Sequence, residues 1–240
     1  MPTLVSADFA QRQERYTRFR TFVRDFLLQQ IAFRLLVKVD VNGLEYIPPT
    51  GPTLLMMNHI AGIDPAILMG VVRPRFVVPM SKIENFRIPV LRQAMQLWGL
   101  YPVQRGTVDR AALNNSIDLL KAGNLVLIAP EGTRQPQLSE AKDGTTYIAT
   151  KADAVIVPVG VDGTGEFIHN VFRLRRTPIT VRFGRAFRFR TDGRERIPRA
   201  ELGRMTQEAM YQLAALLLEN RRGFYSDLSK MTTESIEYVN

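Results

Sequence analysis

A histidine and an aspartate five residues apart are the first pair in this sequence that could do chemistry. His59 and Asp64 lie in the stretch NHIAGIDP, in a chain with one other histidine and no cysteine. An imidazole whose ring hydrogen is held by a carboxylate can act as a general base towards a hydroxyl group. On one continuous helix, a five-residue step would leave the two side chains roughly 140° apart. The pair therefore requires His59 in a loop, with Gly62 letting the chain bend back.

The same stretch also has a purely structural interpretation. An aspartate before a proline, as in Asp64-Pro65, is a strong helix-start signal, because the carboxylate can accept hydrogen bonds from free backbone amides. A carboxylate has two oxygens, so Asp64 could cap a helix and orient an imidazole at once. The stretch alone leaves a catalytic pair and a capped polar turn both open.

Two further loops carry groups suited to binding an anion. In LIAPEGTRQ, an apolar run is followed by Glu131, Gly132, Thr133 and Arg134. The planar donors of an arginine can bind two oxygens of a phosphate or carboxylate together, although PEGT is also good turn chemistry. In LYPVQRGTVDR, Arg105 follows another short run, which is weak evidence in a chain this rich in arginine.

Short apolar runs alternate with amphipathic stretches from residue 44 onward. Predicted strands cover 53–58, 75–80, 99–104, 124–129, 154–161 and 179–184, and predicted helices cover 65–72, 88–98, 107–123 and 198–223. This alternation predicts an α/β fold with a mostly parallel central sheet flanked by helices. Pro158 should mark the edge or end of a strand. Functional groups are expected in loops at the carboxyl ends of the strands.

The N-terminal segment has a different texture. Residues 9–38 contain no proline or glycine and predict one long helix or two short ones. Interleaved phenylalanines and arginines are typical of a helix in a membrane interface, although a helix packed on the domain fits equally well. We expect a helical, membrane-associating segment over 1–43, an α/β domain over 44–225 and a loose polar tail over 226–240.

The composition favours an anionic partner. A net charge of +9 suits nucleic acid, anionic lipid or a phosphorylated substrate, and a merely basic soluble protein is the plain alternative. The lack of cysteine excludes disulfides, thiolate metal sites and a cysteine nucleophile, and two histidines argue against a multi-histidine metal centre. No signal peptide is evident, and no apolar run reaches the roughly 18 residues of a spanning helix.

Four segments taken in order resemble the glycerolipid acyltransferase family, typified by 1-acyl-sn-glycerol-3-phosphate acyltransferase. They are NH-x4-D, an arginine after a glycine-led strand, PEGTR, and VPVGV followed by GTG, and the resemblance spans about residues 40–215. It implies that His59 is the general base and that Asp64 orients it. It further implies substrate binding by Arg105, Glu131, Gly132, Thr133, Arg134, Lys82 and Pro158, with Pro158 on the acyl-donor side. Ala61, Ala129 and Gln135 depart from the family's usual residues.

The function implied by the resemblance is acyl transfer from a thioester to a free hydroxyl of a lysophospholipid. The first candidate acceptor is 1-acyl-sn-glycerol-3-phosphate, which would give phosphatidic acid. The donor would be acyl-CoA or an acyl-carrier-protein thioester, with no bound cofactor, no metal and no nucleic acid. The chain would act on an anionic membrane surface, peripheral or monotopic at the cytoplasmic face. A different lysolipid or polyol acceptor, a thioesterase and a basic membrane-binding protein without activity are the alternatives. No G-x-S-x-G motif signals an acyl-enzyme.

Overall fold

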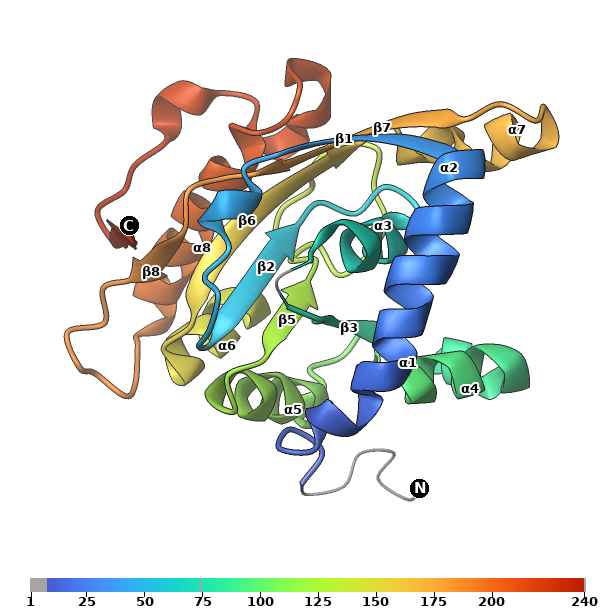
Figure 1. Ribbon diagram of the computed structural model, residues 1–240. Coiled ribbons are helices and arrows are strands. Elements are labelled where there is room, and N and C mark those ends of the chain that lie inside the picture. The colour runs from blue at the N-terminus through green and yellow to red at the C-terminus, as the bar shows by residue number, and fades with distance from the viewer. Residues whose placement is uncertain (1–7, 74, 240) are drawn as a thin grey trace.

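A mixed β-sheet between two helical layers organises the chain (Figure 1). The computed structural model describes residues 8–73 and 75–239. In this part of the chain, nine strands form the sheet: β1 (Val37–Asn42), β2 (Thr53–Met57), β3 (Val77–Lys82), β4 (Tyr101–Val103), β5 (Leu125–Ile128), β6 (Val155–Asp162), β7 (Thr177–Phe183), β8 (Phe187–Phe189) and β9 (Ile236–Tyr238).

The central strands of the sheet run parallel, as the sequence predicts. The strand order is β1-β7-β6-β2-β5-β3-β4, with β8 pairing with both β6 and β9. The neighbours β6, β2, β5, β3 and β4 are parallel to one another. β7 runs antiparallel to β6, and β1 is parallel to β7. The predicted fold class, a mostly parallel sheet flanked by helices, is confirmed.

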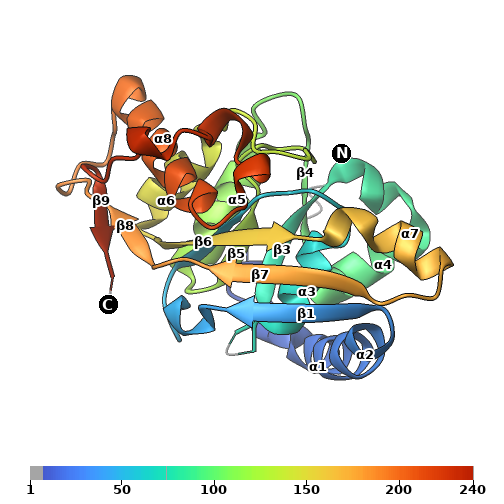
Figure 2. The same cartoon turned by 90° about the horizontal axis from the view of Figure 1, so that it is seen from above.

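Helices cover both faces of the sheet (Figure 2). On one face lie α5 (Arg110–Lys121), α6 (Gly144–Ala152) and α8 (Arg199–Ala214), and on the other lie α3 (Asp64–Val71) and the N-terminal helix. α4 (Pro89–Trp98) and α7 (Phe167–Phe172) extend from one side of the molecule. Because both faces are covered, the central strands are apolar on nearly every residue.

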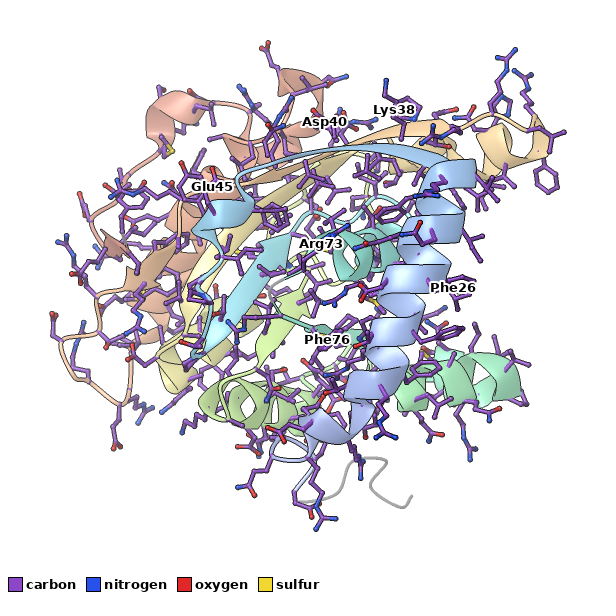
Figure 3. The ribbon with its side chains drawn as sticks, in the orientation of Figure 1. Phe26, Lys38, Asp40, Glu45, Arg73 and Phe76 are labelled. Atoms are coloured by element: carbon purple, nitrogen blue, oxygen red, sulfur yellow. The ribbon has the colours of Figure 1, made fainter. Side chains whose placement is uncertain are left out.

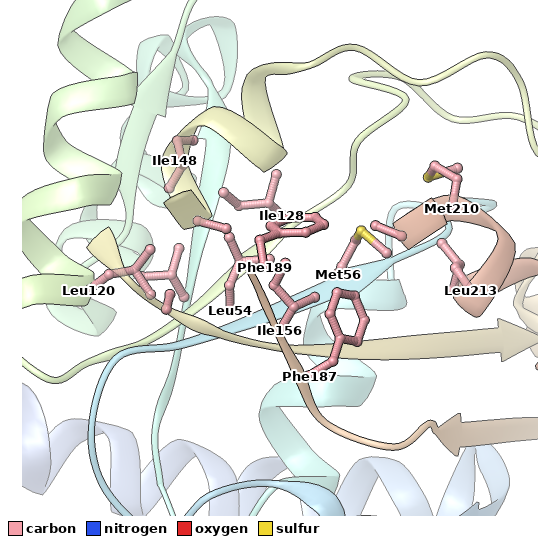
Figure 4. Packing of buried hydrophobic residues seen from close by; sticks show 14 of the residues in the cluster. Leu54, Met56, Leu120, Ile128, Ile148, Ile156, Phe187, Phe189, Met210 and Leu213 are labelled. Atoms are coloured by element: carbon pink, nitrogen blue, oxygen red, sulfur yellow. The ribbon is translucent and has the colours of Figure 1, made fainter. Parts of the chain in front are cut away.

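Alternate residues of each central strand pack against the helices on opposite faces of the sheet. Leu54 and Met56 of β2 pack under α5, α6 and α8, whereas Leu55 and Met57 face the α3 side. Figure 4 shows Leu54 and Met56 among side chains from neighbouring strands and helices. All four are almost fully buried, and burying such a side chain contributes about 1.5–3 kcal/mol. The sheet is therefore held from both sides.

The N-terminal helix is one continuous helix rather than two. It contains a 3₁₀ turn (Gln13–Tyr16), α1 (Thr17–Thr21), a π-helical stretch (Phe22–Ala32) and α2 (Phe33–Leu35). Arg20 anchors it, since this buried guanidinium donates to the Trp98 carbonyl oxygen at 2.7 Å and lies against the rings of Phe76 and Trp98. Burial lowers the pKa of Arg20 to about 10, so it keeps its charge at neutral pH. Among the described residues, no helix is long and apolar enough to cross a membrane.

Two predictions about loops and ends were wrong. Pro158 lies inside β6 rather than at an edge or end, at the place where the partner of β6 changes from β7 to β8. Its carbonyl oxygen accepts from Gly184 on that side, so the amide hydrogen that proline lacks would also have pointed into this interruption. The tail is not loose over its described part, because Glu208 accepts hydrogen bonds from the backbone amides of Glu234 and Ser235 and β9 pairs with β8.

Several elements were not predicted from the sequence. They are β8, β9, α6, α7 and β1, and β1 lies within the segment 1–43 that was predicted to be helical. β8 and β9 are three residues long, and the strand pattern of β1 follows the N-terminal helix with a single residue between them. Strands as short as β8 and β9 depend on their partners, which a local pattern does not identify.

The start of α5 also differs from the prediction. Thr107 was expected to open this helix, but Asp109 is the residue before its first turn, and its carboxylate accepts from the Ala112 amide at 3.0 Å. The other carboxylate oxygen accepts from the Gln104 amide at 2.8 Å, which fixes the loop after β4 to the helix.

We predict that Asp109→Ala lowers the free energy of unfolding by about 1 kcal/mol, because a helix cap is lost. For a chain of this size, the melting temperature should fall by about 2–4 °C. Thr107→Ala is the matched control and should change the melting temperature little, as measured by circular dichroism. An equal loss in both variants would contradict the assignment of the cap to Asp109.

Candidate active site

A cavity of about 370 Å³ lies at the carboxyl ends of the parallel strands. Met57 at the end of β2, Met80 in β3, Val103 in β4 and Leu127 in β5 contribute apolar parts of its wall. The loops after these strands contribute polar groups, among them His59, Arg105, Glu131, Gly132 and Thr133. The predicted gathering of functional groups at this edge of the sheet is thus what the structure shows.

Asn58 holds the start of the histidine loop in place. Its side-chain amide donates to the Val161 carbonyl oxygen at 2.8 Å, and its oxygen accepts from the Val161 amide at 2.7 Å. The buried side chain therefore extends the pairing of β2 with β6 by one step beyond the backbone ladder. Two well-made hydrogen bonds in the interior fix the direction in which the next residue leaves the sheet.

His59 and Asp64 meet, as the sequence predicts. The imidazole Nδ1 lies 2.9 Å from Asp64 Oδ2, and His59 is 7% exposed at the wall of the cavity. An ionised carboxylate can only accept, so Nδ1 carries the hydrogen and Nε2 is the nitrogen left to accept a proton. The arrangement can serve a general base whose tautomer is set by its neighbour.

Asp64 does not cap α3 in the predicted way. Asp64 is the first residue of α3, and its carboxylate turns back to the loop instead of forward to the helix. Oδ2 accepts from the amides of Ile60 and Ala61 at 2.7 and 2.8 Å, in addition to His59. One fully buried oxygen therefore fixes both the imidazole and the backbone that carries it.

Gly62 lies in the turn between His59 and Asp64, where the chain bends back as predicted. Its backbone is not in the left-handed region, so the bend itself does not require glycine. A Cβ atom at this position would lie 3.1 Å from Arg134 Nη2, because the guanidinium packs on Gly62. The Gln135 amide also donates to the His59 carbonyl oxygen at 2.8 Å. These contacts join the NHIAGID loop to the PEGTRQ loop.

Glu131 is turned inward. It is buried, and its Oε2 accepts from the backbone amide and the hydroxyl of Ser139 at 2.9 and 3.2 Å, which closes the loop between them. Burial raises the pKa of Glu131 above its usual value, and the hydrogen bonds from Ser139 offset only part of this shift. Gly132 next to it has a φ of +70°, a conformation that glycine adopts readily.

The remaining predicted residues lie in different places. Both arginines are exposed, but Arg105 lines the cavity, whereas Arg134 packs against Gly62 and does not line it. Lys82 ends β3 and Pro158 is buried within β6, and neither is among the residues that line the cavity. Lys142, which belongs to none of the sequence motifs, does line it. Lys142 directly precedes the start of α6 at Asp143-Gly144. A prediction of this helix start would have placed Lys142 in a loop near the site.

A family model described as Acyltransferase matches residues 38–162, more than half of the chain. This chain belongs to the acyltransferase family. The matched segment contains both the histidine loop and the PEGTR loop, and it ends with β6.

Curated relatives carry consistent names. A chloroplastic 1-acyl-sn-glycerol-3-phosphate acyltransferase of Arabidopsis thaliana is 32% identical over 55% of this chain and 38% of its own length. A protein of the same name from Chlamydomonas reinhardtii is 36% identical over 55% of this chain and 40% of its own. A third, from Borreliella burgdorferi, is 31% identical over 55% of this chain and 54% of its own. The chain spans about half the length of the curated relatives it matches.

A solved structure supports the fold of this acyltransferase family member. The crystal structure of the 1-acyl-sn-glycerophosphate acyltransferase from Thermotoga maritima matches with a TM-score of 0.57 and 21% sequence identity, covering 94% of this chain and 81% of that one. At this identity, the similarity shows a shared fold.

We predict that the free energy of unfolding of Glu131→Gln increases relative to that of the wild type as pH rises. The pKa of Glu131 is raised in the folded state, so the protonated side chain contributes most to stability below the unfolded pKa of about 4.3. This contribution is lost as pH rises through the folded pKa. Glutamine still offers an acceptor to Ser139 but never ionises. Melting temperatures from about pH 4 to pH 8 measure the trend. Glu140→Gln, an exposed change in the same loop, is the control. A wild-type-to-variant difference that stays constant with pH would contradict the prediction.

Proposed function

We propose that this chain is an O-acyltransferase that moves a fatty acyl group from an acyl thioester to the free hydroxyl of a lysophospholipid. The observation that carries the proposal is the His59–Asp64 pair at 2.9 Å on the wall of a cavity that Arg105 also lines. Such a cavity offers a base for a hydroxyl and a cation for a phosphate in one space.

The proposed acceptor is 1-acyl-sn-glycerol-3-phosphate, and the product is phosphatidic acid. Relatives from plants and bacteria named for this acceptor support that choice. The cavity also suits an anionic headgroup, since Arg105 and Lys142 line it and neither forms an ion pair with a described residue. The donor is a thioester of coenzyme A or of acyl carrier protein.

The geometry of the His59–Asp64 pair supports the following transfer. Nε2 of His59 takes the proton from the acceptor hydroxyl while the hydroxyl oxygen attacks the thioester carbonyl carbon. The new C–O bond forms, the C–S bond breaks, and the departing thiolate receives the proton from the imidazolium. A positioned base of this kind contributes about 10²–10⁴-fold to the rate. Asp64 keeps Nδ1 protonated and stabilises the imidazolium as it forms.

We also propose that the chain works at an anionic membrane surface, on its cytoplasmic face, without crossing it. The charge of +9 and the exposed phenylalanines Phe22 and Phe26 of the N-terminal helix support this placement. A lipid acceptor is dilute in water, so an enzyme acting on it gains from contact with the bilayer.

We expect His59→Ala to lower kcat by at least about 10²-fold, because the general base is removed. The assay measures new ester and free fatty acid separately, with lysolipid dispersed in detergent and an acyl-CoA donor. His169→Ala replaces the other histidine, an exposed residue of α7, and should leave kcat unchanged. Full activity in His59→Ala would contradict the assignment of the general base. Release of free fatty acid without new ester by the wild-type protein would indicate a thioesterase.

Replacement of Arg105 by alanine should raise the acceptor KM by roughly 10–100-fold, because a charge-assisted hydrogen bond contributes about 1.5–3 kcal/mol. The donor KM should change much less. Arg110→Ala, an exposed arginine just outside the cavity, is the matched control. A parallel rise in both KM values for Arg105→Ala would show that Arg105 does not bind the acceptor phosphate.

A further inference from the structure

The end of α7 carries large apolar side chains that the fold leaves in solvent. Phe172 is 85% exposed, Leu174 is 97% exposed, and Ile168 one turn earlier is exposed as well. Single exposed apolar residues are ordinary on protein surfaces, but a cluster of them in one short element marks a surface that another phase or molecule covers.

Leu174 also occupies a backbone conformation that disfavours it. α7 ends with the Arg175 amide bonded to the Asn170 carbonyl oxygen and the Leu174 amide bonded to that of Val171. This bonding pattern places Leu174 at the position after the helix where glycine is usual, and its φ is +53°. A leucine there costs conformational energy and makes almost no contact with the rest of the chain, so folding does not account for it.

Basic residues alternate with these apolar ones in FRLRR, residues 172–176. The side chains of Arg173 and Arg175 are exposed. Neither side chain forms an ion pair with a described residue. Arginines beside exposed leucine and phenylalanine are the chemistry of an interfacial anchor, in which the apolar groups enter the acyl region and the guanidiniums meet anionic headgroups.

α4 shows the same arrangement on a longer helix. Val90 is 77% exposed, Ile88, Leu91 and Leu97 are also exposed, and Trp98 at its end is the one residue of α4 that is buried. Val90 and Leu97 are seven residues apart and lie on one side of the helix. An amphipathic helix normally turns such a stripe to the core, but this one turns it to solvent.

These elements lie on one side of the molecule. In Figures 1 and 2, α4, α7 and the N-terminal helix all lie towards the same side. Phe22 and Phe26 of that helix are exposed and stacked, with ring centroids 5.5 Å apart. Figure 3 shows Phe26 on the outer side of the helix and Phe76 on the side that faces the domain.

The cavity lies at the edge of the sheet from which these helices start. α3, α4 and α7 follow the carboxyl ends of β2, β3 and β6, and residues at the ends of β2 and β3 line the cavity. A surface that rests on α4 and α7 would therefore lie beside the site that is proposed to receive a lipid.

We propose that α4, α7 and the outer side of the N-terminal helix form one lipid-docking face, which inserts into bilayers that contain anionic phospholipid. Its inserting residues are Ile88, Val90, Leu91, Ile168, Phe172 and Leu174. The proposal deepens the proposed function, on which it rests for the nature of the substrate. Docking through α7 and α4 holds the catalytic edge of the sheet at the membrane, and the N-terminal helix alone does not suffice.

The test compares the full chain with Phe172→Ser/Leu174→Ser and Val90→Ser/Leu91→Ser in co-sedimentation with vesicles of phosphatidylcholine, with and without phosphatidylglycerol. We expect each double variant to bind vesicles about tenfold or more weakly, because two large apolar side chains no longer leave water. Wild-type binding should require phosphatidylglycerol and weaken with salt.

The matched control is Leu218→Ser/Phe224→Ser, which removes one leucine and one phenylalanine that are about half exposed and lie outside the proposed face. This variant should bind vesicles like the wild type. All variants should keep their melting temperature and their rate on detergent-dispersed substrate. Vesicle binding is measured without catalysis. An absence of transferase activity would therefore overturn the proposed function, whereas the lipid-docking face would still be tested by the binding data.

The depth to which position 172 enters the bilayer is a second, independent measurement. Tryptophan at position 172, in Phe172→Trp, should be quenched by spin-labelled lipid, whereas buried Trp98 should not. Unchanged vesicle binding in both serine variants, or no quenching at position 172, would overturn the proposal. A change of oligomeric state in sedimentation velocity, in place of a change in vesicle binding, would also overturn it and assign the face to a second copy of the chain.

Discussion

One buried carboxylate oxygen sets the geometry on which the candidate site depends. Oδ2 of Asp64 accepts from His59 Nδ1 and from the amides of Ile60 and Ala61, all within 2.9 Å. The same oxygen therefore positions both the imidazole and the backbone before the helix. Burial of the carboxylate strengthens each of these hydrogen bonds, since little water competes for it. The tautomer of His59 is thereby a property of the fold.

The sheet supplies the rigid frame for this arrangement. Asn58 extends the pairing of β2 with β6, and the Gln135 amide binds the His59 carbonyl oxygen from the loop after β5. The histidine loop is thus tied to strands on both sides of β2, which are its neighbours in the sheet. Glu131 and Ser139 close the second loop on itself. Preorganised groups of this kind need not be reordered when a substrate binds.

The helices differ in whether their apolar sides are buried or exposed. Helices that cover the faces of the sheet bury their apolar sides, whereas α4 and α7, which leave the edge of the sheet that carries the cavity, expose theirs. An exposed apolar stripe costs solubility in water and is retained only where something else covers it. The proposed lipid-docking face and the cavity therefore lie next to each other, which suits an acceptor that reaches the site from a bilayer.

The sequence by itself determined the alternation of strands and helices, the mostly parallel sheet, and the residue types of the His59–Asp64 pair. These features follow from local chemistry: apolar runs buried on both faces, and an imidazole with a carboxylate at a spacing that requires a loop. The tertiary structure decided which residues contact one another. The turn of Asp64 back to the loop, the packing of Arg134 on Gly62, the position of Pro158 at a change of strand partner and the pairing of β9 with β8 each join residues from separate elements. The outward stripe of α4 is of the same kind, because a helical pattern shows which side is apolar but not what that side faces. A local pattern fixes a residue's conformation and polarity, whereas its partner is fixed by where the rest of the chain lies.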